Sequence, residues 1–190
     1  MAISIKDLRQ VKAYLPPRIL IYGPPGIGKT TLASEFPNPV WLQVEDGTPS
    51  DLELSSFGRL TSYDEVMEAI AALYSEDHQY KTLVLDSVDK LEPLIWAKLC
   101  ADNNLVNVEA AGFGKGYVLA DSYWRDLLEG ANALRRDKNM NIIFIAHSSI
   151  ENVNDPTAAS YSQYTIRLHK RAIALMQDEM DCLFFLNQDV

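Results

Sequence analysis

Eight residues near the amino terminus have the spacing of a phosphate-binding loop. Residues 23–30 read Gly-Pro-Pro-Gly-Ile-Gly-Lys-Thr, a glycine followed five positions later by Gly-Lys-Thr. The glycines let successive backbone N–H groups point at phosphate oxygens, and the lysine reaches the β- and γ-phosphates. The threonine hydroxyl is a ligand for Mg²⁺. We therefore predict that ATP and Mg²⁺ bind here, at Gly23, Pro24, Pro25, Gly26, Ile27, Gly28, Lys29, Thr30 and Thr31.

Two carboxylates that follow apolar, strand-sized runs could complete such a site. Asp86 comes directly after 82–85 and is predicted to hold Mg²⁺ or its water shell together with Thr30. Glu45 closes the run 40–44, and a carboxylate beside the γ-phosphate could orient or deprotonate the attacking water. Asp46 is the alternative for that role. A single acid at a strand end is usually a turn residue, so the phosphate loop upstream is what favours catalysis.

A histidine ends the apolar run 142–146. A polar side chain at that strand tip could sense the γ-phosphate and move the segment behind it, so His147 joins Lys29 and Glu45 as a catalytic candidate. The segment behind it, 148–164, is polar and is predicted to be a long loop. Tyr161 and Tyr164 lie in this segment and could stack on nucleic-acid bases.

Any nucleic-acid site must be a local basic patch, because the net charge is −9. Lys115 lies in the glycine-rich stretch 112–116, and the other candidates lie on a helix predicted over 166–177. Basic residues on a helix most often form only its solvated face. With that alternative open, the predicted DNA contacts are Lys115, Arg167, Lys170 and Arg171, beside the two tyrosines.

Strand-sized apolar runs alternate with helical patterns, which predicts an α/β protein with a mostly parallel sheet in a three-layer αβα sandwich. In such sheets ligands bind beyond the carboxyl ends of the strands, where Gly23, Glu45, Asp86 and His147 all fall. Strands are predicted at 18–22, 40–44, 82–85, 142–146 and 182–186. Helices are predicted at 28–36, after the capping box 62–65, and at 93–101, 117–136 and 166–177.

The length of 190 residues and the 47% hydrophobic content predict a single domain over 1–190 with its core at about 18–188. Parallel folds of this kind often continue with a further hairpin, so the native protein is expected to extend beyond Val190. The longest apolar runs are strand-sized and the amino terminus lacks the pattern of a signal peptide. A cytoplasmic protein without a membrane partner is therefore expected.

These motifs together resemble the RecA-like ATPase core, over about 18–186. Residues 82–91 look like the Walker B segment of bacterial RecA, and 44–46 like the segment that carries its catalytic glutamate. Residues 143–147 look like its strand that ends in a switch residue, a glutamine in that family. The GPPGIGKTT loop and residues 145–148 are also similar to phage-encoded ATP-binding proteins with a minimal RecA-like core, which include proposed single-strand annealing recombinases.

The resemblance implies a Mg²⁺-dependent, DNA-stimulated ATPase of phage DNA recombination, annealing or repair. It implies single-stranded DNA as partner, with a homo-oligomer and a single-strand binding protein as further partners in a bacterial host. Two departures stand out: the phosphate loop has the form common in AAA+ ATPases, although too little chain remains for their helical lid, and no arginine finger can be assigned. An AAA+-type ATPase that remodels or loads proteins, and a nucleotide switch with little turnover, are the alternatives.

Overall fold

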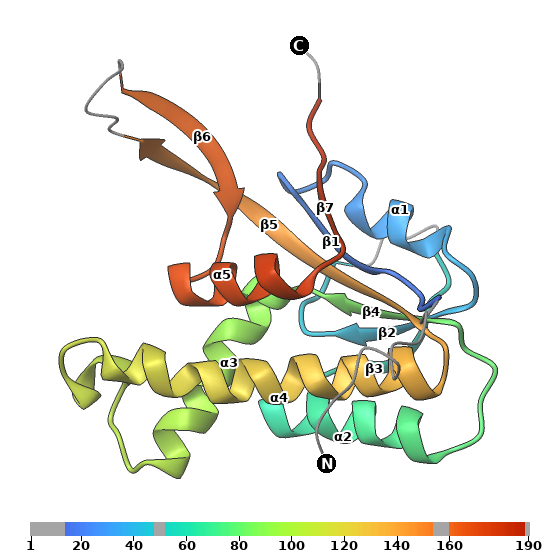
Figure 1. Ribbon diagram of the computed structural model, residues 1–190, viewed down its shortest axis with the longest axis horizontal. Coiled ribbons are helices and arrows are strands. Elements are labelled where there is room, and N and C mark those ends of the chain that lie inside the picture. Colours follow the sequence, from blue (N-terminus) through green and yellow to red (C-terminus); the bar gives the residue numbers. More distant parts are fainter. Residues whose placement is uncertain (1–13, 48–51, 154–159, 189–190) are drawn as a thin grey trace, which may run out of the picture.

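The computed structural model describes residues 14–47, 52–153 and 160–188, and in this part of the chain seven strands form one sheet (Figure 1). Six strands follow the order β3-β2-β4-β5-β1-β7 and pair in parallel, while β6 pairs antiparallel with β5. The strands are β1 (Arg18–Gly23), β2 (Pro39–Gln43), β3 (Ser55–Arg59), β4 (Thr82–Asp86), β5 (Asn141–Val153), β6 (Tyr161–Ile166) and β7 (Cys182–Phe185).

Helices cover both faces of the sheet, so the predicted α/β three-layer sandwich is confirmed. Neighbouring residues of a strand point to opposite faces. On β1, Leu20 packs into the core beneath α2–α5, whereas Ile19 and Ile21 pack on the face of α1. The helices are α1 (Lys29–Ser34), α2 (Tyr63–Ser75), α3 (Val88–Asp102), α4 (Lys115–Asp137) and α5 (Lys170–Glu179), with a 3₁₀ helix η2 (Val108–Ala111).

The strand order places β5 between β1 and β4. Gly23 lies opposite His147 across the β1–β5 pair, and Asp86 lies opposite Ile145 across β4–β5. Asp86 also lies opposite Gln43 at the end of β2, and the N–H of Val44 donates to the Asp86 carbonyl at 2.8 Å. The phosphate loop, Asp86 and the end of β2 therefore meet at one edge of the sheet.

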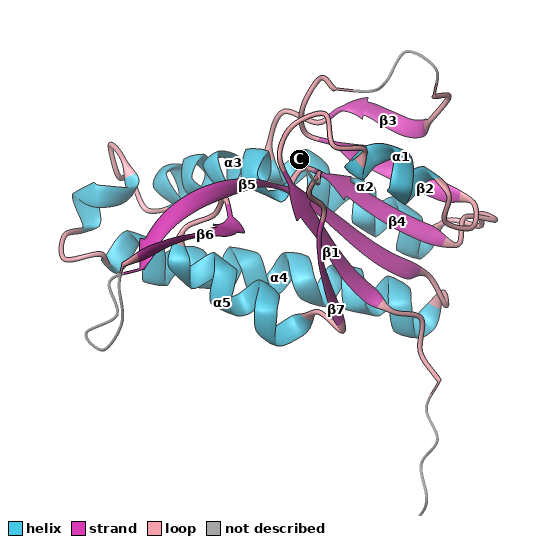
Figure 2. Cartoon of the chain, turned by 90° about the horizontal axis from the view of Figure 1, so that it is seen from above, coloured by secondary structure: helices cyan, strands magenta, loops and turns pink. Residues whose placement is uncertain are grey.

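The segment after His147 differs from its prediction. The strand does not end at His147: β5 continues to Val153 and pairs with β6, from Ser148 opposite Ile166 to Val153 opposite Tyr161. The expected loop over 148–164 is thus wrong for 148–153 and 161–164, and residues 154–159 lie outside the described part. Most side chains of this hairpin are exposed, so the apolar alternation by which a strand is recognised is missing. Figures 1 and 2 show the hairpin projecting from the body.

Three further boundaries were missed for physical reasons. Strand β3 is an edge strand whose side chains are mostly exposed, so it lacks an apolar signal. Helix α3 begins at Val88 and contains Pro93, whereas the sequence predicts that the helix starts at this proline. Helix α5 begins at Lys170 and not at Ile166, which is the last residue of β6. Arg167 therefore does not lie on that helix. Among the described residues, no helix is long and apolar enough to span a membrane.

Candidate active site

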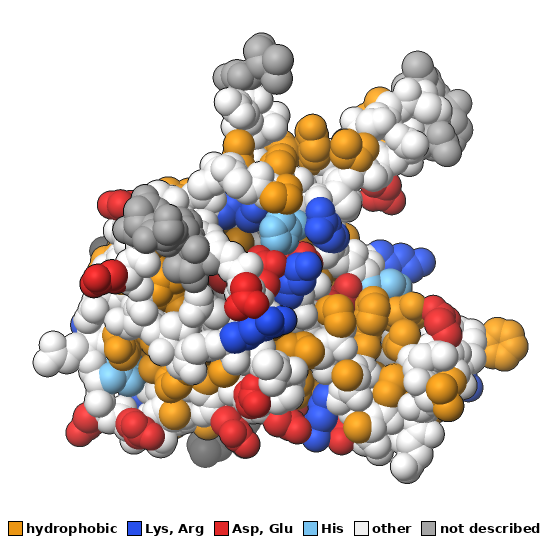
Figure 3. Space-filling model, turned by 180° about the vertical axis from the view of Figure 1, so that it is seen from behind, with side chains coloured by type: hydrophobic (Ala, Val, Ile, Leu, Met, Phe, Trp, Pro, Cys, Tyr) orange, Lys and Arg blue, Asp and Glu red, His pale blue; other side chains and the backbone are white. Residues whose placement is uncertain are grey.

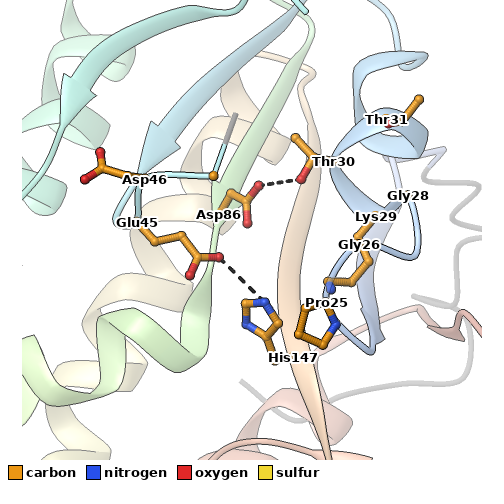
Figure 4. Close-up of a pocket in the computed structure, with 11 residues that line it drawn as sticks. Pro25, Gly26, Gly28, Lys29, Thr30, Thr31, Glu45, Asp46, Asp86 and His147 are labelled. Atoms are coloured by element: carbon orange, nitrogen blue, oxygen red, sulfur yellow. Dashed lines mark hydrogen bonds and ion pairs between the residues drawn. The ribbon is translucent and has the colours of Figure 1, made fainter. Parts of the chain in front are cut away.

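The carboxyl edge of the sheet brings the predicted site residues together. Because of the order β2-β4-β5-β1, Glu45, Asp86 and His147 lie beside the phosphate loop although they are far apart in sequence. Figure 4 shows Glu45 directed toward His147 and Asp86 directed toward Thr30, around a single pocket. The pocket has a volume of about 310 Å³ and is lined by Pro25, Gly26, Gly28, Lys29, Thr30, Thr31, Glu45, Asp46, Gly47, Asp86 and His147.

The phosphate loop has the backbone that its glycines predict. Gly26 and Gly28 have φ angles of 73° and 94°, a region that side chains other than hydrogen rarely allow. Gly28 is the N-cap of α1 and offers no side chain to the first N–H groups of that helix. Gly23 does not line the pocket: a Cβ there would lie 2.4 Å from the Leu186 carbonyl oxygen, so this glycine admits the chain that follows β7.

The lysine of the loop is buried and bonded to its own loop. Lys29 Nζ donates to the carbonyl oxygens of Gly23 at 3.1 Å and Pro24 at 2.9 Å. Burial lowers the pKa of Lys29, and the nearby carboxylates, Asp86 foremost, oppose that shift without cancelling it. A phosphate group would add negative charge beside this amine. Three of the predicted loop residues, Gly23, Pro24 and Ile27, are not among the residues lining the pocket.

The two predicted metal ligands are in contact. Thr30 Oγ1 donates to Asp86 Oδ2 at 2.9 Å. Burial raises the pKa of Asp86 to about 6, and the hydrogen bond from Thr30 offsets only part of this effect. A carboxylate that is desolvated in this way gains most from an adjacent cation. Hard oxygen ligands from one carboxylate and one hydroxyl, completed by phosphate and water, suit Mg²⁺, so the residues fit this ion.

The adjacent acids Glu45 and Asp46 point in different directions. Figure 4 shows Glu45 facing His147 across the pocket and Asp46 turned away from it. The Asp46 carboxylate accepts a hydrogen bond from Arg59 Nη1 at 2.7 Å, and 77% of its side chain is exposed. The Glu45 side chain is only 23% exposed. This geometry favours Glu45 over Asp46 for contact with a water molecule at the γ-phosphate.

His147 lies at the point where β5 exchanges its parallel partner for an antiparallel one. Its Nδ1 is 3.0 Å from Asp89 Oδ2, and its backbone N–H donates to Asp89 Oδ1 at 2.9 Å. Its Nε2 is 3.9 Å from Glu45 Oε1, too far for a hydrogen bond. The ring is therefore held on one side by Asp89 and directed on the other toward Glu45.

The aromatic candidates for DNA contact are exposed on β6. Tyr161 is 51% exposed and Tyr164 is 45% exposed. The Tyr164 ring packs on Phe185 at 5.0 Å between centroids, and Phe185 packs on Tyr22, the residue before the phosphate loop. In Figure 3 hydrophobic side chains gather between the two upper projections of the molecule. Tyr164 therefore lies near the site, whereas Tyr161 lies at the other end of β6.

The basic candidates lie near the starts of α4 and α5. Lys115 begins α4, and two residues later Tyr117 stacks on His169 with 3.9 Å between ring centroids. His169 is the N-cap of α5, directly before Lys170. Arg171 is already paired with Asp121, at 3.2 Å from Nε to both carboxylate oxygens. Arg167 Nη2 donates to the Ser148 carbonyl at 3.3 Å, which leaves Lys115 and Lys170 as exposed amines.

Two buried carboxylates on α3 were missed from the sequence. Asp89 binds His147, and Glu92, one turn later, accepts the backbone N–H of His169 at 3.0 Å from each oxygen. Burial raises the pKa of Glu92 to about 7, and the charge of Asp89 adds to this effect. Asp89 lies within the Walker B-like segment 82–91 and Glu92 directly follows it. Their spacing of three residues indicates only that they share a helix face.

We expect Glu92→Gln to gain stability relative to the wild type when the pH is raised from 5 to 8. A carboxyl with a raised pKa holds its proton more tightly when folded, so stability falls as the pH rises from about 4.5 to about 7. Glutamine keeps an acceptor for His169 and does not ionise. The difference in unfolding free energy between variant and wild type should grow by up to about 3 kcal/mol between these pH values.

Urea unfolding at pH 5 and pH 8 measures this difference. Glu68→Gln on the exposed side of α2 is the control and should show no comparable change. The interpretation fails if Glu92→Gln and wild type lose stability in parallel.

Comparison with known proteins bears on the family and the fold of the chain. The sequence matches the family described as "AAA domain" over residues 15–190. No curated protein matches the chain in sequence. A solved structure described as "Crystal structure of the RadB recombinase" is similar with a TM-score of 0.55 and 14% identity, over 90% of this chain and 75% of that one.

The family match and the fold together indicate a RecA-like P-loop ATPase core. At 14% identity the structural similarity shows the fold alone. A fold by itself does not single out one activity, so the residues of the pocket carry the functional argument.

Proposed function

This chain belongs to the AAA domain family, and from that premise we propose that it is a Mg²⁺-dependent ATPase stimulated by single-stranded DNA. We propose that it acts in phage DNA recombination, annealing or repair in the cytoplasm of a bacterial host. Residues 1–190 would form one ATPase domain that works as a homo-oligomer, with a single-strand binding protein as a further partner. The phage setting follows from the resemblance of the phosphate loop and of residues 145–148.

One observation carries the ATPase proposal: a buried lysine and a partly buried glutamate face the same pocket. Lys29 belongs to the phosphate loop that follows β1, and Glu45 follows β2, which is separated from β1 by β4 and β5. The cation is positioned for phosphate charge, and the carboxylate is positioned for a water molecule beyond it. Asp86 and Thr30 line the same pocket in contact with each other and support a metal-bound nucleotide.

In the mechanism we propose, the chain contributes position and charge. The N–H groups of the phosphate loop bind the β- and γ-phosphates, and Lys29 neutralises them. Thr30 and Asp86 hold Mg²⁺, which when bound stabilises negative charge on the phosphates. Glu45 orients the attacking water and accepts its proton. His147 contacts the γ-phosphate and links its presence to the β5–β6 hairpin.

The hairpin supports the DNA part of the proposal. It continues directly from His147, and the Arg167 N–H at its other root donates to the His147 carbonyl at 2.8 Å. Its exposed Tyr161 and Tyr164 offer stacking surfaces, each worth about 1–3 kcal/mol per base. Lys115, Arg167, Lys170 and Arg171 would supply phosphate contacts near that root.

A second candidate is an ATPase that remodels or loads a protein partner. The hairpin residues 148–166 contain no lysine or arginine, and Ile150 on β5 is 66% exposed. An arm without positive charge and with an exposed isoleucine suits a protein surface as well as it suits bases. The phosphate loop sequence, common in AAA+ ATPases, also favours this candidate.

An ATPase assay with and without single-stranded DNA separates the candidates. We expect DNA to raise the rate of hydrolysis, and we expect Lys115→Ala/Lys170→Ala to weaken that stimulation and DNA binding together. Each lost phosphate contact should reduce the slope of log K against log salt by roughly 0.7. The measurements are steady-state hydrolysis and fluorescence anisotropy of labelled oligonucleotide across a salt series.

The control removes two positive charges from the opposite edge of the sheet. Lys81 precedes β4 and Lys138 follows α4, so Lys81→Ala/Lys138→Ala should leave the salt slope near that of wild type. Equal slopes in both double variants would place the DNA contacts elsewhere. Hydrolysis that does not respond to DNA would favour the protein-partner candidate, and tight ATP binding without turnover would favour a nucleotide switch.

A further inference from the structure

The buried carboxylate of Asp89 contacts both the ring and the backbone of His147. Its side chain is 2% exposed, and its oxygens lie 3.0 and 3.2 Å from His147 Nδ1. The same carboxylate accepts the His147 backbone N–H at 2.9 Å. We propose that Asp89 is a positioning residue that holds the His147 imidazole by Nδ1, so that Nε2 faces the nucleotide pocket. The inference rests on the proposed ATPase for its kinetic consequence only.

The carboxylate also decides which ring nitrogen carries the hydrogen. Burial raises the pKa of Asp89, but the hydrogen bonds from the His147 ring and backbone lower it by more, so Asp89 remains ionised. An ionised carboxylate only accepts hydrogen bonds, so Nδ1 must carry the hydrogen. In a neutral ring Nε2 then has the free lone pair.

The surroundings of the ring leave Nε2 free to respond to a ligand. The Glu45 carboxylate lies 3.9 Å from Nε2, beyond hydrogen-bond distance. Asp86 and Lys29 line the same pocket as His147, and Arg167 lies at the hairpin root. With the ring fixed at Nδ1, a small shift at the γ-phosphate changes what Nε2 contacts without turning the ring. Asp89 thus gives the histidine one defined orientation.

Helix α3 provides its own control for this inference. Glu92 lies one turn after Asp89 and is also buried. It also accepts a backbone N–H, that of His169 in the segment between β6 and α5. Within the described part of the chain Glu92 forms no hydrogen bond with the His147 ring, which distinguishes the two acids. If the carboxylates only held the hairpin in place, the two would be equivalent. If the ring contact matters, only Asp89 affects His147.

The first test measures the ring itself and needs no turnover. Long-range ¹H–¹⁵N NMR reports which nitrogen of each of the three histidines carries hydrogen, and the signals missing from His147→Ala identify that ring. In the wild type with a neutral ring, we expect hydrogen on Nδ1. In Asp89→Asn the amide can still accept the backbone N–H while donating to Nδ1, so the hydrogen should move to Nε2. The same tautomer in both proteins, or hydrogen on Nε2 in the wild type, would overturn the proposal.

The second test is a double-mutant cycle on hydrolysis. Asp89→Asn should lower kcat roughly 10–100-fold, the usual range for a residue that orients a functional histidine, with KM for ATP within about threefold. Adding Asp89→Asn to His147→Ala should cause no further loss, because the residue acts through the ring. Glu92→Gln should leave kcat within about twofold.

Each outcome has a definite meaning. Additive losses in the cycle, or an equal loss in Glu92→Gln, would show that Asp89 only supports the fold and would overturn the proposal. If the wild type does not hydrolyse ATP, the proposed function fails while the NMR result still decides the role of Asp89. Circular dichroism of each variant checks that the loss of kcat is not a loss of folded protein.

Discussion

Lys29→Ala is expected to abolish ATP turnover and to weaken ATP binding. Lys29 is buried and lines the pocket, and the negative charges of Asp86, Asp89 and Glu45 lie close enough to raise the pKa of its amine. Without this cation, phosphates would enter a pocket of negative charge. Loss of one such stabilising group lowers kcat by about 10²–10³-fold or more.

Steady-state hydrolysis and calorimetric ATP titration measure the two effects. Lys90→Ala is the matched control, because Lys90 lies exposed on α3 and its substitution removes the same charge. Hydrolysis by Lys29→Ala at the wild-type rate would refute the assignment of the phosphate loop, and with it the ATPase proposal.

Glu45→Gln should bind ATP with nearly normal affinity and hydrolyse it on the order of 100-fold more slowly. A general base contributes about this factor or more, while an amide of the same shape preserves the pocket. Single-turnover hydrolysis and a separate binding measurement distinguish slow chemistry from weak binding.

Asp46→Asn is the control for Glu45→Gln, because the Asp46 carboxylate is turned outward and paired with Arg59. This variant should hydrolyse ATP at close to the wild-type rate. A slow Asp46→Asn with a fast Glu45→Gln would reverse the assignment within the pair. Equal, small effects in both would mean that neither acid activates the water.

The buried strands could be predicted because burial leaves a signal in composition. Strands β1 and β4 are apolar and closed by Gly23 and Asp86, so their ends were evident. Strand β3 and the hairpin half of β5 are held by backbone pairing, and their exposed side chains carry no periodic pattern. The prediction of a long loop after His147 is therefore wrong for the hairpin strands because they have no buried face.

The pocket could be predicted further than its support. The phosphate loop is a short motif whose spacing is fixed by the phosphates, and the structure brings Lys29, Thr30 and Asp86 to one pocket. The choice between Glu45 and Asp46 needed side-chain directions, which adjacent positions in a sequence do not give. Asp89 could not be found from sequence, because its partner His147 is brought to it only by the packing of α3 beside β5.

The position of β1 in the sheet also affects how the protein folds. This strand is made early, yet Ile19 pairs only with residues made much later, Ile143 on β5 and Cys182 on β7, among the described residues. Contacts so distant in sequence form slowly, since the loop between them must be closed first. The phosphate loop therefore acquires its shape late, after α2, α3 and α4 have been synthesised. Until then a growing chain carries the nucleotide motif without a nucleotide site, so ATP can stabilise the finished fold but cannot guide its early steps.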